Sequence, residues 1–417
     1  MGRAASRYWS ALRTAAWLDA GRARAYAWIF AAMAAALSVA YLALSSGVHD
    51  PLGRALGTDF ASFWTASHLA LSGNPAAAWD VSAHRASQTA LFGEGAGYAA
   101  FFYPPPYLLL CLPLALLPYT VSLAVWLATT GAAWMWTVRG WLGREAGWLP
   151  VAAFPAVLVN AGHGQNGFLT AALLGAAALV AQRRPWVSGI LFGLLVVKPH
   201  VAILVPLFLL VSGNWRALLA AGLTAAGLCL GSLVALGPDA WRGFFENAAL
   251  ARAALEAGLV GYAKMQSAYA GMRLLGGSDG TAWLVQACAT LAAAMAVWAT
   301  RRGTETARGA VLACATPLAT PFLLDYDLTI MAIPMAWLLR TGVRAGFMPW
   351  EKLMLLAAFV LPLAGRMIGT NLGVPVTPFV VLGLLLCVVR RAGSATEAPW
   401  DVGLRVLEDR VPNPATR

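Results

Sequence analysis

The chain has 417 residues, of which 60% are hydrophobic and 11% charged. Soluble globular domains carry about 25% charged and 45–50% apolar residues, so this composition excludes a cytosolic enzyme, a secreted disulfide scaffold and a disordered chain, and it indicates an all-α polytopic membrane protein. We interpret the net charge of +11 as arginine in cytoplasmic loops beside anionic membrane lipids, and not as a nucleic-acid-binding surface.

Apolar runs follow one another along almost the whole chain. Residues 1–24 form a basic cytoplasmic segment, and the first membrane-spanning run covers 25–44. A polar outer loop follows over 45–102, with a short amphipathic helix expected at the membrane surface near 61–71. A second outer loop spans 237–280. The other apolar runs lie near 107–138, 148–162, 167–182, 186–198, 200–213, 217–236, 281–299, 309–323, 327–340, 352–368 and 374–389.

These runs predict one transmembrane domain over residues 25–390, with about twelve crossings, both termini inside and a cytoplasmic tail over 391–417. Pro113 and Pro118 are expected to break the run that is too long for one span. Several other runs are shorter than the ~20 residues of a straight span, which is tolerated where helices pack on protein or line a wet cavity. The positive-inside rule sets the orientation, because a shift by one crossing in the middle of the chain would place five arginines outside. They are Arg139, Arg144, Arg183, Arg184 and Arg216.

With this topology, the polar motifs of six separate segments fall on the outer face. They are Asp59, Tyr103 with three prolines, the turn from Gly162 to Gly167, Lys198-Pro199-His200, Asp325-Tyr326-Asp327, and Arg366 with Asn371. Polar and ionisable residues at the ends of apolar runs are costly unless they are paired or functional. The sequence therefore predicts a site at the boundary between membrane and water on the outer side.

Several of these motifs occur in the order that a known family shows. The segments are Thr58-Asp59-Phe60, Gly73-Asn74-Pro75, Trp79-Asp80, Phe102-Tyr103-Pro104-Pro105, Gly164-Gln165-Asn166, Lys198-Pro199, and Pro321 through Tyr326-Asp327-Leu328. On these residues the chain resembles glycosyltransferase family 87 over about residues 25–390. Each motif is weak alone, and their order and spacing together are specific.

The resemblance implies a GT-C fold and a sugar donor linked to polyprenyl phosphate, with mannose or another hexose or pentose as the sugar. It also implies transfer to a lipid or glycan acceptor on the periplasmic side of the inner membrane, and it makes Asp59 the catalytic residue. Some family members have a histidine near the position of Asp325-Tyr326-Asp327. This chain has none there, so a second catalytic role is not carried over to that position.

The chemistry of such a transfer agrees with the residues present. A base is needed near the acceptor hydroxyl and positive charge near the departing phosphate. Asp59, at the head of an apolar and aromatic segment, is the candidate base. The alternative is structural, because Thr58 or Asp59 is also a suitable N-cap for a helix that starts at Phe60.

The remaining candidates each have a structural alternative. Lys198 and Arg366 are phosphate-binding candidates, and the alternative is snorkelling to lipid headgroups. Lys264 and Arg273, in the second outer loop, are weaker candidates. Gln165 and Asn166 between glycines either approach a sugar or phosphate or form an ordinary turn. His163 and His200 either donate to phosphate or acceptor or pack at the interface. Tyr103 either binds the donor or, with its prolines, sets a rigid start to the next helix. Asp325 and Asp327 bind sugar hydroxyls or cap the following helix.

Two other function classes remain open. A secondary transporter, or a lipid or polyprenol flippase, is the main alternative, although internal repeats and polar residues near the membrane midplane are not evident. A membrane subunit without chemistry is the other. No cofactor is predicted. The five cysteines lie in or beside apolar runs without metal-ligand spacing, and the Asp and His residues within 58–68 and 80–84 leave a divalent metal as an alternative.

Overall fold

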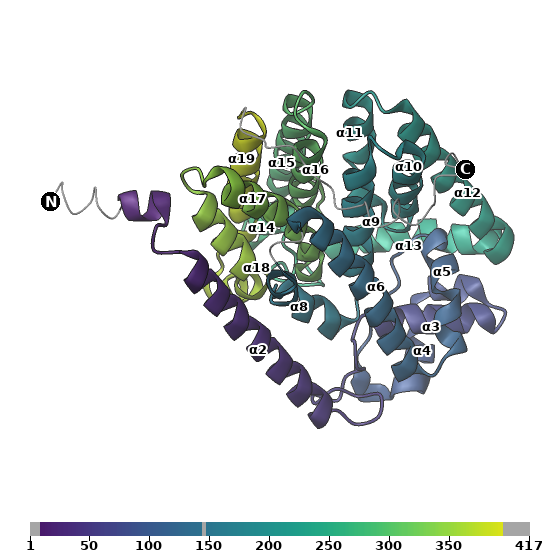
Figure 1. Ribbon diagram of the computed structural model, residues 1–417. Coiled ribbons are helices and arrows are strands. Elements are labelled where there is room, and N and C mark those ends of the chain that lie inside the picture. The colour runs from purple at the N-terminus through teal and green to yellow at the C-terminus, as the bar shows by residue number, and fades with distance from the viewer. Residues whose placement is uncertain (1–8, 144–146, 395–417) are drawn as a thin grey trace, which may run out of the picture.

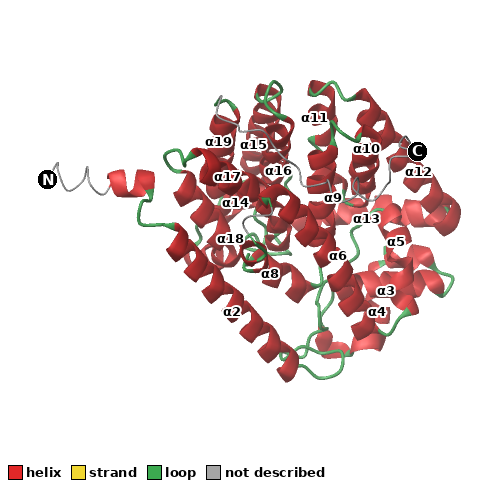
Figure 2. Ribbon diagram, viewed as in Figure 1, coloured by secondary structure: helices red, strands yellow, loops and turns green. Residues whose placement is uncertain are grey.

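The computed structural model describes residues 9–143 and 147–394. Over these residues the chain is all-helical apart from three isolated β-bridges, and Figure 2 shows helices joined by loops throughout. The expected helical fold class is therefore confirmed.

The helices are arranged as Figure 1 shows. In the first part of the chain they are α2 (Ala20–Leu44), α3 (Phe60–Leu71), η1 (Pro75–Ala78), α4 (Val81–Phe92), η2 (Glu94–Ala96), α5 (Pro105–Cys111), η3 (Leu112–Leu116), α6 (Tyr119–Leu142), α7 (Leu149–Ala152), α8 (Ala156–His163), α9 (Gly167–Val180), α10 (Pro185–Leu194), η5 (Leu195–Val197), η6 (Pro199–Ala202) and α11 (Val205–Val211). In the second part they are α12 (Trp215–Leu236), α13 (Pro238–Glu256), α14 (Ala268–Leu274), α15 (Asp279–Ala299), α16 (Glu305–Ala319), η7 (Asp325–Met331), α17 (Ala332–Ala345), α18 (Glu351–Leu372) and α19 (Val376–Ala392).

Five helices within the described residues are long and apolar enough to cross a membrane, namely α2, α6, α12, α15 and α18. Several shorter apolar helices pack among them, including α9, which has nine of its 14 residues buried. As expected, the long run before residue 138 is interrupted, because α5 passes into η3 and α6 begins after Pro118. The structure is that of a helical membrane protein, while the count of twelve crossings stays a prediction.

Several interhelical turns that the sequence places on the cytoplasmic side contact one another at one end of the bundle. Asn214 donates from its side-chain amide to the carbonyl oxygen of Ala181 at 2.6 Å, and the amide nitrogen of Gln182 donates to Glu305 at 2.5 Å. At the same end, Arg391 forms a buried ion pair with Glu351. The tips of α10, α11, α15, α16 and α19 lie together at this end, at the top of Figure 1. We refer to it as the basic end.

The first polar loop folds against the bundle and contains α3 and α4. The expected helix near 61–71 is present as α3, but seven of its 12 residues are buried. The rings of Phe60 and Phe63 pack within 6.4 Å, centroid to centroid, of Trp126 on α6. The apolar residues of α3 thus face protein on most sides, which differs from the surface-lying amphipathic helix that the sequence suggested.

The second polar loop is also mostly helical. α13 and α14 occupy most of it, and an irregular segment joins them. Met265 forms an isolated antiparallel bridge with Leu324, and the amide nitrogen of Gln266 donates to Leu323 at 2.8 Å. These backbone contacts hold the preceding residue, Lys264, close to the start of η7.

The packing of α4 on α3 buries His84, and this predicts how the free energy of unfolding depends on pH. The His84 ring is buried, and its Nε2 lies 3.3 Å from the carbonyl oxygen of Ser62. Burial lowers the pKa of His84 to about 4, below the value of about 6.5 in an unfolded chain. The folded state therefore binds fewer protons than the unfolded state between these pH values. The free energy of unfolding should fall as the pH drops from about 6.5 to about 4, by at most about 1.4 kcal/mol per pH unit, with no His84 contribution to the slope above this window.

Thermal midpoints of the detergent-solubilised protein across pH 4–8 measure this slope. The His84→Gln variant should lose it, whereas His68→Gln on α3 should keep it. An equal acid slope in the wild type and His84→Gln would contradict the assignment.

Candidate active site

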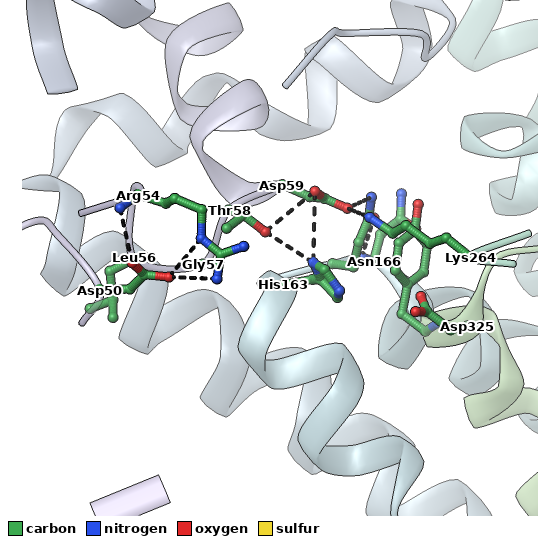
Figure 3. A network of polar contacts seen from close by, with 12 residues as sticks. Asp50, Arg54, Leu56, Gly57, Thr58, Asp59, His163, Asn166, Lys264 and Asp325 are labelled. Atoms are coloured by element: carbon green, nitrogen blue, oxygen red, sulfur yellow. Dashed lines mark hydrogen bonds and ion pairs between the residues drawn. The ribbon is translucent and has the colours of Figure 1, made fainter. Parts of the chain in front are cut away.

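Asp59 stands at the start of α3, with its side chain free of the helix. Its backbone takes the N-cap position, with φ −88° and ψ −23°, yet the side chain accepts no capping hydrogen bond. The Asp59 amide nitrogen donates to the carbonyl oxygen of His163 at 3.0 Å, which ties α3 to the end of α8. The carboxylate is therefore not used as a helix cap. Figure 3 shows it between Thr58 and His163 on one side and Lys264 on the other.

Four side chains from three segments surround this carboxylate. Gln165 donates from Nε2 to Asp59 Oδ2 at 3.3 Å, and Lys264 Nζ lies 3.8 Å from the same oxygen. His163 Nδ1 lies 3.8 Å from Asp59 Oδ1 and 2.9 Å from Thr58 Oγ1. The Asp59 side chain remains 21% exposed. It is thus oriented by polar neighbours while one part of it stays open to a ligand.

The turn between α8 and α9 positions Gln165 beside Asp59. Buried Asn160 holds this turn, because its Nδ2 donates to the Gln165 carbonyl oxygen at 3.1 Å and its Oδ1 accepts from the Gly167 amide at 3.0 Å. The Gly164 backbone is left-handed, with φ +63°, and an added Cβ would lie 2.6 Å from the Phe60 Cβ. This close approach requires glycine and brings the turn against α3.

Tyr103 supports the same glutamine from the other side. Its hydroxyl donates to Gln165 Oε1 at 3.0 Å, and the Asn166 amide donates to that oxygen at 2.8 Å. Burial, with a contribution from the Asp327 carboxylate, raises the pKa of Tyr103 well above its usual value. Tyr103 is therefore a neutral donor, and it fixes the Gln165 amide so that its nitrogen faces Asp59.

Lys198 lies beneath this turn and is 2% exposed. Its ammonium contacts Asp327 Oδ1 at 2.5 Å and Asn166 Oδ1 at 3.0 Å. The other Asp327 oxygen, Oδ2, accepts from the Leu324 amide at 3.2 Å, so this carboxylate also caps the start of η7. The ion pair therefore joins the turns before α9 and η6 to the first turn of η7.

Asp325, Tyr326 and Arg366 form the opposite wall. Arg366 Nη1 lies 3.1 Å from Asp325 Oδ2, and the arginine side chain is 48% exposed. The Tyr326 ring lies 5.3 Å from Lys198 Nζ and 5.6 Å from Lys264 Nζ, measured to the ring centroid. The sequence had assigned no role to Tyr326 or to Asn160. The signal in the sequence was only that polar turns interrupt the apolar runs near these two residues.

His200 is the candidate that lies apart. Its buried ring packs 6.1 Å from the Phe322 ring, centroid to centroid. It lines a small cavity of about 10 Å³ together with Thr170 and Asp327, so it lies behind the Lys198 ion pair. No group of three or more His, Cys, Asp or Glu side chains within the described residues is arranged to hold a metal ion.

The buried ion pair between Lys198 and Asp327 predicts how substitutions there change stability. The Lys198→Met variant would leave the Asp327 carboxylate buried without its partner, which costs about 3–5 kcal/mol. Thermal unfolding in detergent should show a lowered midpoint for this variant. The double variant Lys198→Met/Asp327→Asn keeps an acceptor for Leu324 and should recover most of the loss. A double variant less stable than the single one would show that the pair is not the stabilising element.

Comparison with known proteins identifies the family of the chain. No curated protein and no solved structure matches the chain. The sequence model of glycosyltransferase family 87 matches residues 101–321, which is more than half of the 417 residues and includes Tyr103, Gln165, Lys198 and Lys264. The protein is a membrane protein that belongs to glycosyltransferase family 87.

Proposed function

We propose that the protein transfers a single sugar from a polyprenyl-phosphate donor to a hydroxyl group of a lipid or glycan acceptor, with Asp59 as the general base. One observation supports this most directly. The Asp59 carboxylate is held by Gln165 and faces His163 and Lys264, yet it caps no helix and stays partly exposed. Asp59 lies outside the range of the family match, so its role rests on this geometry.

The proposed reaction is a single displacement at the anomeric carbon. The acceptor oxygen forms a bond to that carbon, while the bond from the carbon to the phosphate oxygen breaks and the phosphate takes the electron pair. The acceptor proton passes to Asp59. Because a phosphate leaves without a strong general acid, one carboxylate suffices, provided that positive charge stabilises the leaving group.

Lys264 and Arg366 are the proposed phosphate ligands. Both side chains are partly exposed, at 18% and 48%. Each is near a single carboxylate, and both lie on the wall that Tyr326 forms. Lys198 is enclosed by Asp327 and Asn166, so we assign it the positioning of the Gln165 turn rather than contact with phosphate. His163 and Gln165 then remain to orient the acceptor or the sugar.

We further propose that the site faces the extracytoplasmic side of the plasma membrane. Arg183, Arg216 and Arg391 lie in or beside turns at the basic end, whereas the turns around Asp59 lie at the other ends of the helices. Arginine accumulates in cytoplasmic loops. This distribution supports cytoplasmic termini. A transmembrane domain over residues 25–390 with about twelve crossings remains part of the proposal.

A transfer assay tests the proposed function. Purified protein is incubated with radiolabelled polyprenyl-phosphate sugars and a membrane-lipid extract, and labelled products are separated from the donor. We expect product from at least one donor. If no donor yields product, and a vesicle assay shows instead that labelled lipid crosses the membrane, the protein is a flippase and the proposal fails.

The Asp59→Asn variant should lower kcat by about 10²–10⁴-fold, the usual contribution of a general base. The asparagine keeps the size and one oxygen acceptor for Gln165, so the thermal midpoint and donor binding should stay near the wild-type values. Asp80→Asn is the matched control, because Asp80 is an N-cap whose Oδ1 accepts from the Ser82 and Ala83 amides. Unchanged turnover in Asp59→Asn would exclude this role for the carboxylate.

Lys264→Gln and Arg366→Gln should each raise the KM for the donor. A hydrogen bond to a charged group contributes about 1.5–3 kcal/mol, so an increase of about tenfold or more is expected in steady-state kinetics. Arg242→Gln is the control, because this exposed arginine lies on α13 and pairs with Asp239. Donor KM values that move equally in all three variants would indicate a general charge effect instead of specific phosphate contacts.

A further inference from the structure

A large groove lies at the opposite end of the bundle from Asp59. Its volume is about 530 Å³, within the range of about 300–1,000 Å³ typical of ligand sites. The N-terminal half of α2 forms one wall, and α6, α7, α17 and α18 form the others. On α6 the lining residues are Val138 and Leu142, whereas Leu123 of the same helix lies near the site turn at Gly164. At 1.5 Å per residue, Val138 is about 22 Å from Leu123 along the helix.

The walls of the groove are mainly apolar. Phe154, Leu355 and Phe359 are among the residues that line it. Across from them stands α2, of whose 25 residues only Ala27 is buried. The other faces of α2 expose large apolar side chains, including Trp28 and Ile29, as expected for a helix in contact with hydrocarbon. Figure 1 shows α2 running obliquely along the edge of the bundle. An occupant would therefore come from the lipid phase.

The lining of the groove carries an excess of positive charge. Arg24, Arg340, Arg344 and Lys352 all line the groove. Asp19 is the one acidic residue in the described lining, and its carboxylate is used to cap α2, since it accepts from the Arg22 amide at 2.8 Å. Lys352 Nζ donates to the Leu18 carbonyl oxygen at 2.9 Å. An ammonium has three donors, so two N–H groups of Lys352 remain for a further acceptor.

We propose that this groove binds an anionic glycerophospholipid from the leaflet at the basic end. Its phosphate lies between Arg24 and Lys352, and one acyl chain lies between α2 and the rings of Phe154 and Phe359. Charge complementarity identifies the headgroup class, and the apolar walls identify the tail. The lipid braces α2, which has few buried residues of its own. This inference does not depend on the proposed function, because the groove is separate from the Asp59 site.

Native mass spectrometry of the full chain in detergent tests the proposal. Phosphatidylglycerol and phosphatidylcholine are added at equal concentration, and the bound fraction and the thermal midpoint are recorded. We expect one molecule of phosphatidylglycerol bound in preference to phosphatidylcholine, with a higher midpoint. Arg24→Glu/Lys352→Glu should weaken phosphatidylglycerol binding at least tenfold.

Two further variants distinguish binding in the groove from a general effect of charge. Arg183→Glu/Arg216→Glu makes the same change in charge at the same end of the bundle, outside the groove, and should bind as the wild type does. Ala23→Trp fills the groove from the α2 side and should weaken binding of either phospholipid. Equal binding of both phospholipids by the wild type, unchanged binding by Ala23→Trp, or displacement of phosphatidylglycerol by an equal amount of polyprenyl phosphate would overturn the proposal.

Discussion

A lysine ammonium buried where three turns meet holds the candidate site together. Lys198 can stay charged inside the bundle only if its desolvation is offset by close partners, and here the Asp327 carboxylate and the Asn166 side-chain oxygen are these partners. The ion pair therefore requires the turns before α9 and η6 and the first turn of η7 to come together. The positions of Gln165 and Tyr326 depend on those turns. Gln165 in turn reaches Asp59.

The Asp59 carboxylate is held in place by its neighbours and is still partly accessible. Glutamine, histidine and lysine side chains orient the carboxylate, and part of it stays open. Lys264 comes from the second polar loop, Gln165 from an interhelical turn and Asp59 from the first polar loop. Three separate parts of the chain must be folded before the site exists. Such preorganised charge is most effective where water is largely excluded.

Much of this could be predicted from the sequence. The apolar runs gave the helical class, and Pro113 and Pro118 marked the break before α6. The interrupted turns with Asp59, Gln165 and Lys198 pointed to one shared site because each placed a polar residue at the end of an apolar run. These predictions work because hydrophobic periodicity and proline act locally along the chain.

Other features could not be predicted, because they depend on long-range packing. The sequence does not show that Lys198 meets Asp327, 129 residues later, or that Asn160 holds the Gln165 turn. It also gave α3 an amphipathic character, whereas the aromatic residues of the loop and of α6 surround that helix. The groove beside α2 likewise forms only when α2 packs along the edge of the bundle.

The stereochemistry of the product tests the central claim most directly. Among the described residues around the site, Asp325 and Asp327 are buried and lie 3.1 Å and 2.5 Å from their cationic partners. Asp59 lies 3.8 Å from His163 and from Lys264 and is 21% exposed, so it is the most accessible of the three carboxylates. A single base acting on the acceptor gives one displacement, whereas retention requires an enzyme nucleophile and two displacements. NMR spectroscopy of the purified product should show an anomeric configuration inverted relative to the donor. A retained configuration would contradict the account.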